Sequence, residues 1–329
     1  MPETPLDRNL DRLADLLVEN ATVALSGTRL SEELGAAPST LWDWMGRLRT
    51  MGVEIKGLPG TGYRLVKVPD ILTSRQVKRG LHRGSFGGRI HHLYKTDSTM
   101  KEAARLAVGG SPHGTLVVAE EQTAGRGRLG HTWISEPSVG LYFTLLARPP
   151  LAPNAAPILT LVTGIAVAES LADASGLAMD LRWPNDVLTN QKKCAGILVE
   201  MTAEPDRIKH VLIGVGINVN QERISAGLEA EATSLRLERG QSFSRLEILV
   251  GILKRLEHYY NRLLQEGPAV IVERFTEISS YARGKRVKVL DSKDGLTGVT
   301  AGLTPEGVLL VRRDDGRTER VLSGHVRPD

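Results

Sequence analysis

Apolar and polar residues repeat with helical and strand periods along most of the chain, and these periods predict its elements. Residues 27–34 and 39–49 show helical spacing and are separated by a tight turn. Residues 53–65 then alternate apolar and polar side chains around a Gly/Pro turn, which predicts a hairpin. This order of elements is typical of a winged helix-turn-helix, whose second helix enters the major groove of DNA.

The second of these helices would present a mixed surface to DNA. Its outward residues include Asp43, and an acid repels phosphate. Residues 1–66 hold seven Lys/Arg against nine Asp/Glu, so we expect modest DNA affinity without dimerisation, and a small interaction or dimerisation domain remains the alternative. If the segment binds DNA, the expected contacts are Ser39, Trp42, Arg47, Arg49 and Lys56.

Strand and helix patterns then mix over residues 67–280, and short alternating strands between 286 and 323 follow. We expect an α+β multidomain protein with a winged helix-turn-helix over 1–66, a mixed α/β domain over 67–280 and an SH3-like β-barrel over 281–329. In the central domain the patterns predict strands over 114–120, 139–147, 181–188, 194–201 and 211–220, and helices over 100–107, 158–175 and 247–265.

Composition limits the class of protein. The chain has 329 residues, 41% hydrophobic and 24% charged, which is typical of a globular protein of two or three domains. A single cysteine, Cys194, can build neither an internal disulfide nor a zinc cluster, so we expect a reducing cytoplasmic location and no structural metal. The strongest apolar stretch, 158–168, is shorter than the roughly 20 residues that span a bilayer, so no membrane anchoring is expected.

Two basic features follow strands of the central segment. Gly125, Gly127 and Gly130 fit a dinucleotide-binding spacing, but the residues after them form a poor helix, so this match is interpreted as false. Arg126 and Arg128 stand on this glycine-rich loop and can fold over a phosphate. A solvated basic loop is the alternative interpretation. The second basic feature is a lysine at the turn before residues 194–201, and the alternative there is a solvated turn residue.

Five short motifs occur together. They are Asp97-Ser98-Thr99, Gln122 to Arg128 (QTAGRGR), Trp183-Pro184-Asn185-Asp186, Lys193 to Glu200 (KCAGILVE) and Gly214 to Asn218 (GVGIN). In this order they resemble the bifunctional biotin protein ligase and biotin operon repressor family. With the expected terminal domains, the resemblance extends over nearly the whole chain.

The resemblance implies a central domain of the biotin/lipoate ligase type and a two-step ligation. Biotin and Mg²⁺-ATP would form biotinyl-5′-AMP, and a lysine of a biotin carboxyl carrier protein would then accept the biotinyl group. It also implies a biotin-responsive repressor that binds operator DNA as a homodimer.

The resemblance assigns roles to individual residues. Arg126, Arg128 and Lys193 would be catalytic, with the arginines ordered over the adenylate and Lys193 at the carboxylate and α-phosphate. Biotin would be bound by Ser98, Thr99, Met100, Gln122, Arg126, Gly127, Arg128 and Lys193, and the nucleotide by Trp183, Asn185, Asp186 and Asn218. Met100 replaces the Asn of many relatives, and residues 221–245 lack the Trp that some relatives close over adenine.

Two other functions fit parts of this pattern. A non-catalytic biotin-sensing repressor would bind biotin and DNA, but would have no use for the loop arginines and Lys193. A lipoate protein ligase would share the general fold, but the Gly-Arg-Gly-Arg and Trp-Pro-Asn-Asp segments favour biotin.

Overall fold

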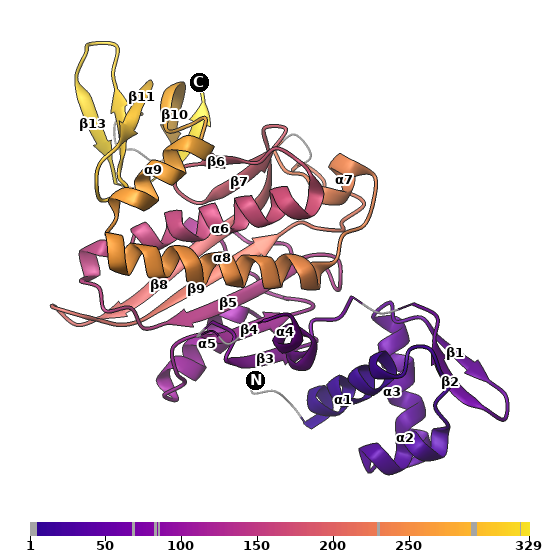
Figure 1. The fold of residues 1–329 in the computed structure, drawn as a ribbon. Helices are drawn as coiled ribbons and strands as arrows, with labels where there is room; N and C mark the ends of the chain where they lie inside the picture. The colour runs from indigo at the N-terminus through magenta and orange to yellow at the C-terminus, as the bar shows by residue number, and fades with distance from the viewer. Residues whose placement is uncertain are drawn as a thin grey trace.

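Three groups of elements follow one another along the chain in the computed structural model, as Figure 1 shows. The structure describes residues 5–67, 70–81, 84, 86–228, 231–290, 295–322 and 324–329. The first group lies beside strand β3 and helix α4, at one end of the central sheet, and the last group lies beside helix α9.

The first group, called the N-terminal unit below, has three helices and a hairpin. The expected helices and hairpin are present, whereas the first helix was not predicted. Ser26 caps the second helix by accepting a hydrogen bond from the Arg29 backbone, and Gly35 ends it with a left-handed φ of 63°. Its elements are α1 (Pro5–Glu19), α2 (Gly27–Leu34), α3 (Pro38–Thr50), β1 (Ile55–Leu58) and β2 (Gly62–Leu65).

The central group is built on a seven-stranded sheet with strand order β3-β4-β5-β9-β8-β7-β6. Strands β3 and β4 are parallel, and every other neighbouring pair is antiparallel. The five expected strands are present, with the segment expected over 181–188 divided between β6 and β7. The strands are β3 (Arg89–Leu93), β4 (Thr115–Ala119), β5 (Leu141–Ala147), β6 (Asp180–Arg182), β7 (Asp186–Thr189), β8 (Lys192–Ala203) and β9 (Ile208–Ile217).

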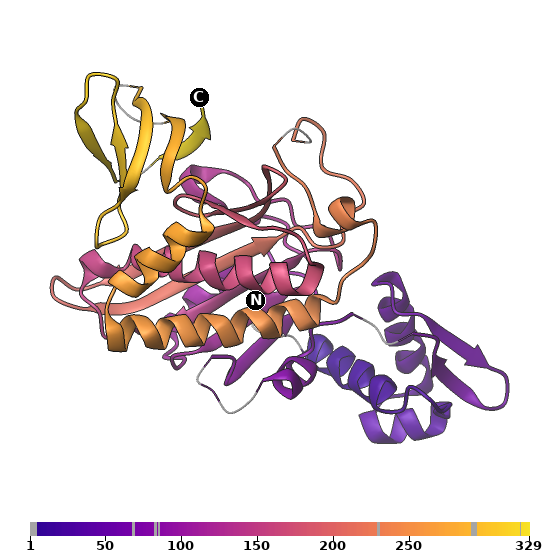
Figure 2. The same ribbon diagram turned by 45° about the horizontal axis from the view of Figure 1, so that its top comes forward.

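Helices cover both faces of this sheet. Helices α6 (Ile158–Ser175) and α8 (Arg245–Glu266) lie side by side over one face, as Figures 1 and 2 show, and α5 (Thr99–Val108) packs on β4, β5 and β9 from the other. The smaller helices are α4 (Ser74–Gly80), α7 (Leu235–Arg239) and α9 (Ala269–Ile278).

The helix expected over 158–175 is present as α6. Together with the 3-10 turn before it, α6 makes Pro153–Ser175 long and apolar enough to cross a membrane by length and composition, whereas the apolar stretch 158–168 was expected to be too short. However, 72% of its most apolar window is buried inside the protein, where α6 packs against α8, α9 and the sheet. Its apolar character is therefore that of a core helix.

The last group is an antiparallel sheet of strand order β13-β12-β11-β10-β14. Four of its strands were expected, but β14 was not, and Ser323 at the end of the fourth expected strand lies outside the described residues. Its buried valines Val287 and Val311 belong to the same apolar cluster as the central sheet. The strands are β10 (Arg283–Leu290), β11 (Thr297–Leu303), β12 (Leu309–Arg312), β13 (Thr318–Val321) and β14 (His325–Pro328).

Candidate active site

A cavity of about 460 Å³ lies over the middle of the central sheet. Its lining comes from the start of α5, the loop between β4 and β5, the β6–β7 segment, strands β8 and β9, residues within 218–228 and 231–232, the end of β10 and strand β14. Side chains more than 200 residues apart in the sequence therefore line one space.

One part of the lining is a hydrogen-bonded set at the start of α5. The backbone and the hydroxyl of Thr99 donate to Gln122 Oε1 at 2.9 and 3.1 Å, and Gln122 Nε2 donates to Ser135 Oγ at 2.9 Å. The fully buried Ser98 hydroxyl has no hydrogen-bond partner among the described residues. Because a buried polar group without a partner is costly, this hydroxyl is free to bind a polar ligand.

Glycines on β8 and β9 let side chains lie directly on the sheet. A Cβ atom at Gly216 would lie 2.5 Å from the Trp133 ring, and one at Gly214 would lie 2.6 Å from Met100 Sδ. Trp133 was not identified from the sequence. Trp133 and Met100 together give this part of the cavity an apolar floor.

Cations surround one buried carboxylate. Asp186 Oδ1 lies 2.6 Å from Lys193 Nζ, and Asp186 Oδ2 lies 2.8 Å from Arg182. Burial alone would raise the pKa of Asp186, but Lys193 and then Arg182 outweigh burial and lower it. Asp186 therefore stays ionised and holds the Lys193 ammonium in the cavity.

The loop between β4 and β5 carries both expected arginines. Arg128 donates to Asn185 Oδ1 at 2.9 Å, and Arg126 pairs with Glu200 at 3.2 Å. Residues 128–130 form only one 3-10 turn, with Leu129 at a left-handed φ of 54°, so no helix follows the glycines. Burial lowers the pKa of Arg128, although nearby Asp186 opposes the shift.

Strand β14 adds side chains that the sequence did not identify. His325 and Arg327 line the cavity, and Arg327 lies 3.0 Å from Glu231 and 3.8 Å from Asp186. No local motif marks them, since their partners stand about a hundred residues or more earlier in the chain. Arg182, which directly precedes Trp183, also lines the cavity and was not identified.

The cavity brings together all the expected catalytic and biotin-binding residues and most of the expected nucleotide-binding ones. Trp183 is the exception, because it is buried away from the cavity lining and its indole donates to the Gly307 carbonyl at 3.0 Å. The expected residues in the lining are Ser98, Thr99, Met100, Gln122, Arg126, Gly127, Arg128, Asn185, Asp186, Lys193 and Asn218.

The residues expected to contact DNA lie on α3 and β1. Ser39, Trp42 and Arg47 are exposed on α3, with Trp42 retaining 65% of its accessible surface. Lys56 is exposed on β1. The Arg49 guanidinium differs, because it donates to the Ile55 carbonyl at 3.2 Å and connects α3 to β1.

The cavity chemistry fits an elongated acid together with a phosphate. A free buried hydroxyl suits a polar head, the Trp133 and Met100 floor suits an apolar body, and the cations suit carboxylate or phosphate oxygens.

Comparison with known proteins points to one family. Residues 93–218 match the Biotin/lipoate A/B protein ligase family, and residues 283–326 match the Biotin protein ligase C terminal domain. The chain is 36% identical over 314 residues to "Bifunctional ligase/repressor BirA" of Bacillus subtilis (strain 168), covering 92% of this chain and 94% of that protein. It is 30% identical over 289 residues to the protein of that name from Escherichia coli (strain K12), covering 88% of each.

A solved structure agrees with this comparison. "Biotin protein ligase from Aquifex aeolicus in complex with biotin and ATP" is similar with a TM-score of 0.63 and 32% sequence identity, covering 73% of this chain and 98% of that one.

Proposed function

The chain belongs to the biotin protein ligase family, and from this premise we propose how its cavity joins biotin to AMP and passes the biotinyl group to a carrier lysine. It is a biotin ligase, and ATP and biotin are its substrates. The observation that carries the proposed mechanism is the convergence of Lys193, Arg126 and Arg128 in one cavity with the set formed by Ser98, Thr99 and Gln122.

In the first step, an oxygen of the biotin carboxylate attacks the α-phosphorus of ATP. The new bond joins that oxygen to phosphorus, and pyrophosphate leaves with the bonding electrons. Lys193 and Arg128 donate hydrogen bonds to the phosphoryl oxygens, where negative charge grows in the transition state. Lys193 is already positioned for this role by its 2.6 Å contact with Asp186.

Biotin itself is bound by the polar set and the apolar floor. Ser98, Thr99 and Gln122 bond the ring, while Met100 and Trp133 contact its apolar surface. Asn185, Asp186 and Asn218 face the nucleotide. Gly127 lies in the cavity lining and has no side chain, so the loop can approach the ligand closely, and its backbone N–H donates to the His131 carbonyl at 2.7 Å.

In the second step, a carrier lysine amine attacks the biotinyl carbonyl, an amide forms, and AMP leaves with the electrons of the broken anhydride bond. Arg126 and Arg128 cover the intermediate and exclude water, which would otherwise hydrolyse it. The partner is therefore a biotin carboxyl carrier protein that presents an exposed lysine.

Mg²⁺ bound to the ATP substrate would supply positive charge that offsets the phosphate charge. Such ions are usually held by substrate phosphates with one or two carboxylates. Of the carboxylates in the described cavity lining, Asp186 and Glu231 already pair with cations, so Glu136 would be the residue to hold the ion beside the substrate phosphates.

The experiment that tests this proposal measures pyrophosphate release with biotin as the sole acid, and then with lipoate. Biotin-dependent release, followed by biotin transfer to a carrier domain, is expected. Release with lipoate alone would show a lipoate ligase. Biotin and DNA binding without pyrophosphate release would show a sensing repressor that lacks the enzyme activity.

A second role, repression, is favoured by the N-terminal unit. Helices α2 and α3 followed by the β1-β2 hairpin fit a winged helix-turn-helix over residues 1–66, and the protein would bind a two-fold operator as a homodimer. Residues 67–280 then form the catalytic domain and 281–329 an SH3-like barrel, in a protein that works in the cytoplasm without membrane anchoring.

The repressor role is tested by a mobility-shift titration with the DNA upstream of the protein's own gene. Biotin with ATP is expected to strengthen retardation, and Arg47→Ala to weaken it. The absence of any retardation at low salt would rule this role out and leave the ligase activity untouched.

A further inference from the structure

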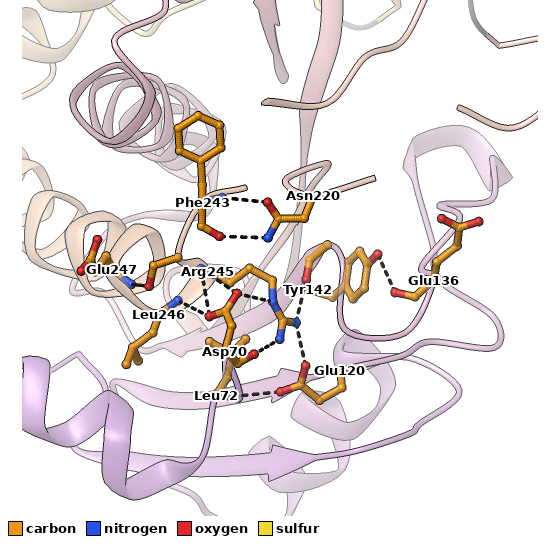
Figure 3. A network of polar contacts seen from close by, with 12 residues as sticks. Asp70, Leu72, Glu120, Glu136, Tyr142, Asn220, Phe243, Arg245, Leu246 and Glu247 are labelled. Atoms are coloured by element: carbon orange, nitrogen blue, oxygen red, sulfur yellow. Dashed lines mark hydrogen bonds and ion pairs between the residues drawn. The ribbon is translucent and has the colours of Figure 1, made fainter. Parts of the chain in front are cut away.

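A network of ion pairs, called the ion-pair network below, connects the N-terminal unit to the central sheet through Asp11, His92, Glu120, Arg245 and Asp70. His92 on β3 lies 2.8 Å from Asp11 of α1 through Nδ1 and 3.1 Å from Glu120 through Nε2. Arg245, at the start of α8, lies between Glu120 at 2.6 Å and Asp70 at 3.0 Å, as Figure 3 shows. The side chains of His92 and Arg245 are fully buried.

Negatively and positively charged side chains alternate along the ion-pair network. Burial alone would lower the pKa of His92, but Asp11 and then Glu120 outweigh burial and raise it to about 10. Burial would likewise raise the pKa of Glu120, but Arg245 and His92 lower it to about 2. Both side chains are therefore charged at neutral pH, and the imidazolium donates from both ring nitrogens to carboxylates.

Apolar and polar contacts around the ion-pair network hold the N-terminal unit in place. Tyr94, just after β3, belongs to the same buried cluster as the core of α1, α2 and α3, and its ring meets the His92 ring at 4.7 Å. Thr73 donates to Asp15 of α1 at 2.7 Å. The end of β3 is thus packed from one side by the N-terminal unit.

The same strand ends lead directly into the biotin-binding set. After the paired residues of β3 and β4, the ladder continues through backbone bonds from Glu120 to Leu93 and from Thr96 to Glu121. Two residues after Glu120, Gln122 accepts both hydrogen bonds of Thr99. A shift of the strand ends at His92 and Glu120 would therefore move these ligand-binding side chains.

We infer that Asp11 is a positioning residue for biotin: through His92 and Glu120 it fixes the strand ends that carry Ser98, Thr99 and Gln122. This inference rests on the proposed function. It means that the N-terminal unit contributes to biotin affinity even when no DNA is bound. Since coupling between two sites is reciprocal, bound biotin in turn stabilises the packing of α1 against the central group.

The test compares full-length Asp11→Asn with wild type in biotin-dependent ATP–pyrophosphate exchange. The expected result is a rise of about tenfold in the KM for biotin, within the usual range of coupling between sites. The KM for ATP and kcat should stay within about twofold of the wild-type values, because the ion-pair network supports the strand ends that carry the biotin-binding side chains and does not support Lys193. Asp11→Glu, which keeps the charge, is expected to recover part of the biotin affinity.

The matched control is Glu19→Gln. Glu19 lies on the same helix and also joins the N-terminal unit to the central group, but it pairs with Arg75 and Arg79 of α4. Its removal should leave the KM for biotin unchanged. An equal rise in the KM for biotin in both variants would indicate general loosening of the N-terminal unit. An unchanged KM for biotin in Asp11→Asn would show that the ion-pair network does not position the biotin-binding residues. Either result overturns the inference.

A measurement on the wild type needs no variant. Saturating biotin is expected to slow amide hydrogen exchange in α1 more than in the β1-β2 hairpin. Unaltered exchange in α1 with biotin bound would overturn the inference. A wild type without biotin-dependent exchange activity would instead refute the proposed function, so the two failures are distinguishable.

Discussion

Lys193→Ala gives the sharpest test of the reaction chemistry. The substitution removes an ammonium that now lies 2.6 Å from Asp186 and 5.4 Å from the centre of the Trp133 ring. A preorganised donor to a developing charge is worth about 3 kcal/mol, which corresponds to a loss of about 100-fold in the rate of adenylation. The loss should appear in kcat/KM for biotin-dependent ATP–pyrophosphate exchange.

The fold should tolerate this change. Asp186 would keep Arg182 at 2.8 Å, so the carboxylate would not be left as an unpaired buried charge, which is the costly case. Lys192→Ala is the matched control, because adjacent strand residues point to opposite faces and Lys192 does not line the cavity that holds Lys193. An exchange rate for Lys193→Ala within twofold of the Lys192→Ala rate would refute the assigned role.

Three further predictions follow from the geometry. Arg128→Gly removes the hydrogen bond to Asn185 that holds the loop, so activated biotin should escape, and biotin label on an unrelated protein should rise; no rise would refute the covering role. Gly216→Ala would place a Cβ 2.5 Å from Trp133, so overpacking of about 1–3 kcal/mol should raise the KM for biotin, while Gly57→Ala, with open space around it, should not. Thermal unfolding measured across pH should show stability lost as the pH falls from 4.5, the ordinary pKa of Glu120, toward about 2, its pKa in the folded protein. Stability should also be lost as the pH rises from 6.5, the ordinary pKa of His92, toward about 10. If His92→Gln loses as much stability at alkaline pH as the wild type, this prediction is contradicted.

Local patterns predicted most of the secondary structure. Caps and periodicity indicated α2, α3, α6 and α8, because each has either a clear amphipathic stripe or a long apolar run with end signals. Helix α1 was not predicted, although Leu10, Leu13 and Leu17 recur at helical spacing and are buried. Strand β14 was missed because it is short and gains its place by pairing with β10.

The site could be predicted only where a motif marks it. The glycine-rich loop and Lys193 carry local signals, and the structure places both in the cavity. Trp183 was expected beside the nucleotide, but its indole points to Gly307, outside the cavity lining, because adjacency to Asn185 and Asp186 does not fix the direction of a side chain. Arg327 could not be found, because its place beside Asp186 depends on how two sheets pack.

The shared core of the two sheets limits how the protein can be divided. Trp183 reaches across to Gly307, and Val287 lies in one apolar cluster with the strands under the cavity. A chain cut after residue 280 would leave this surface facing water and would also lose His325 and Arg327 from the cavity wall. A working enzyme must therefore keep the strands that follow residue 280, including β14, which completes the cavity wall.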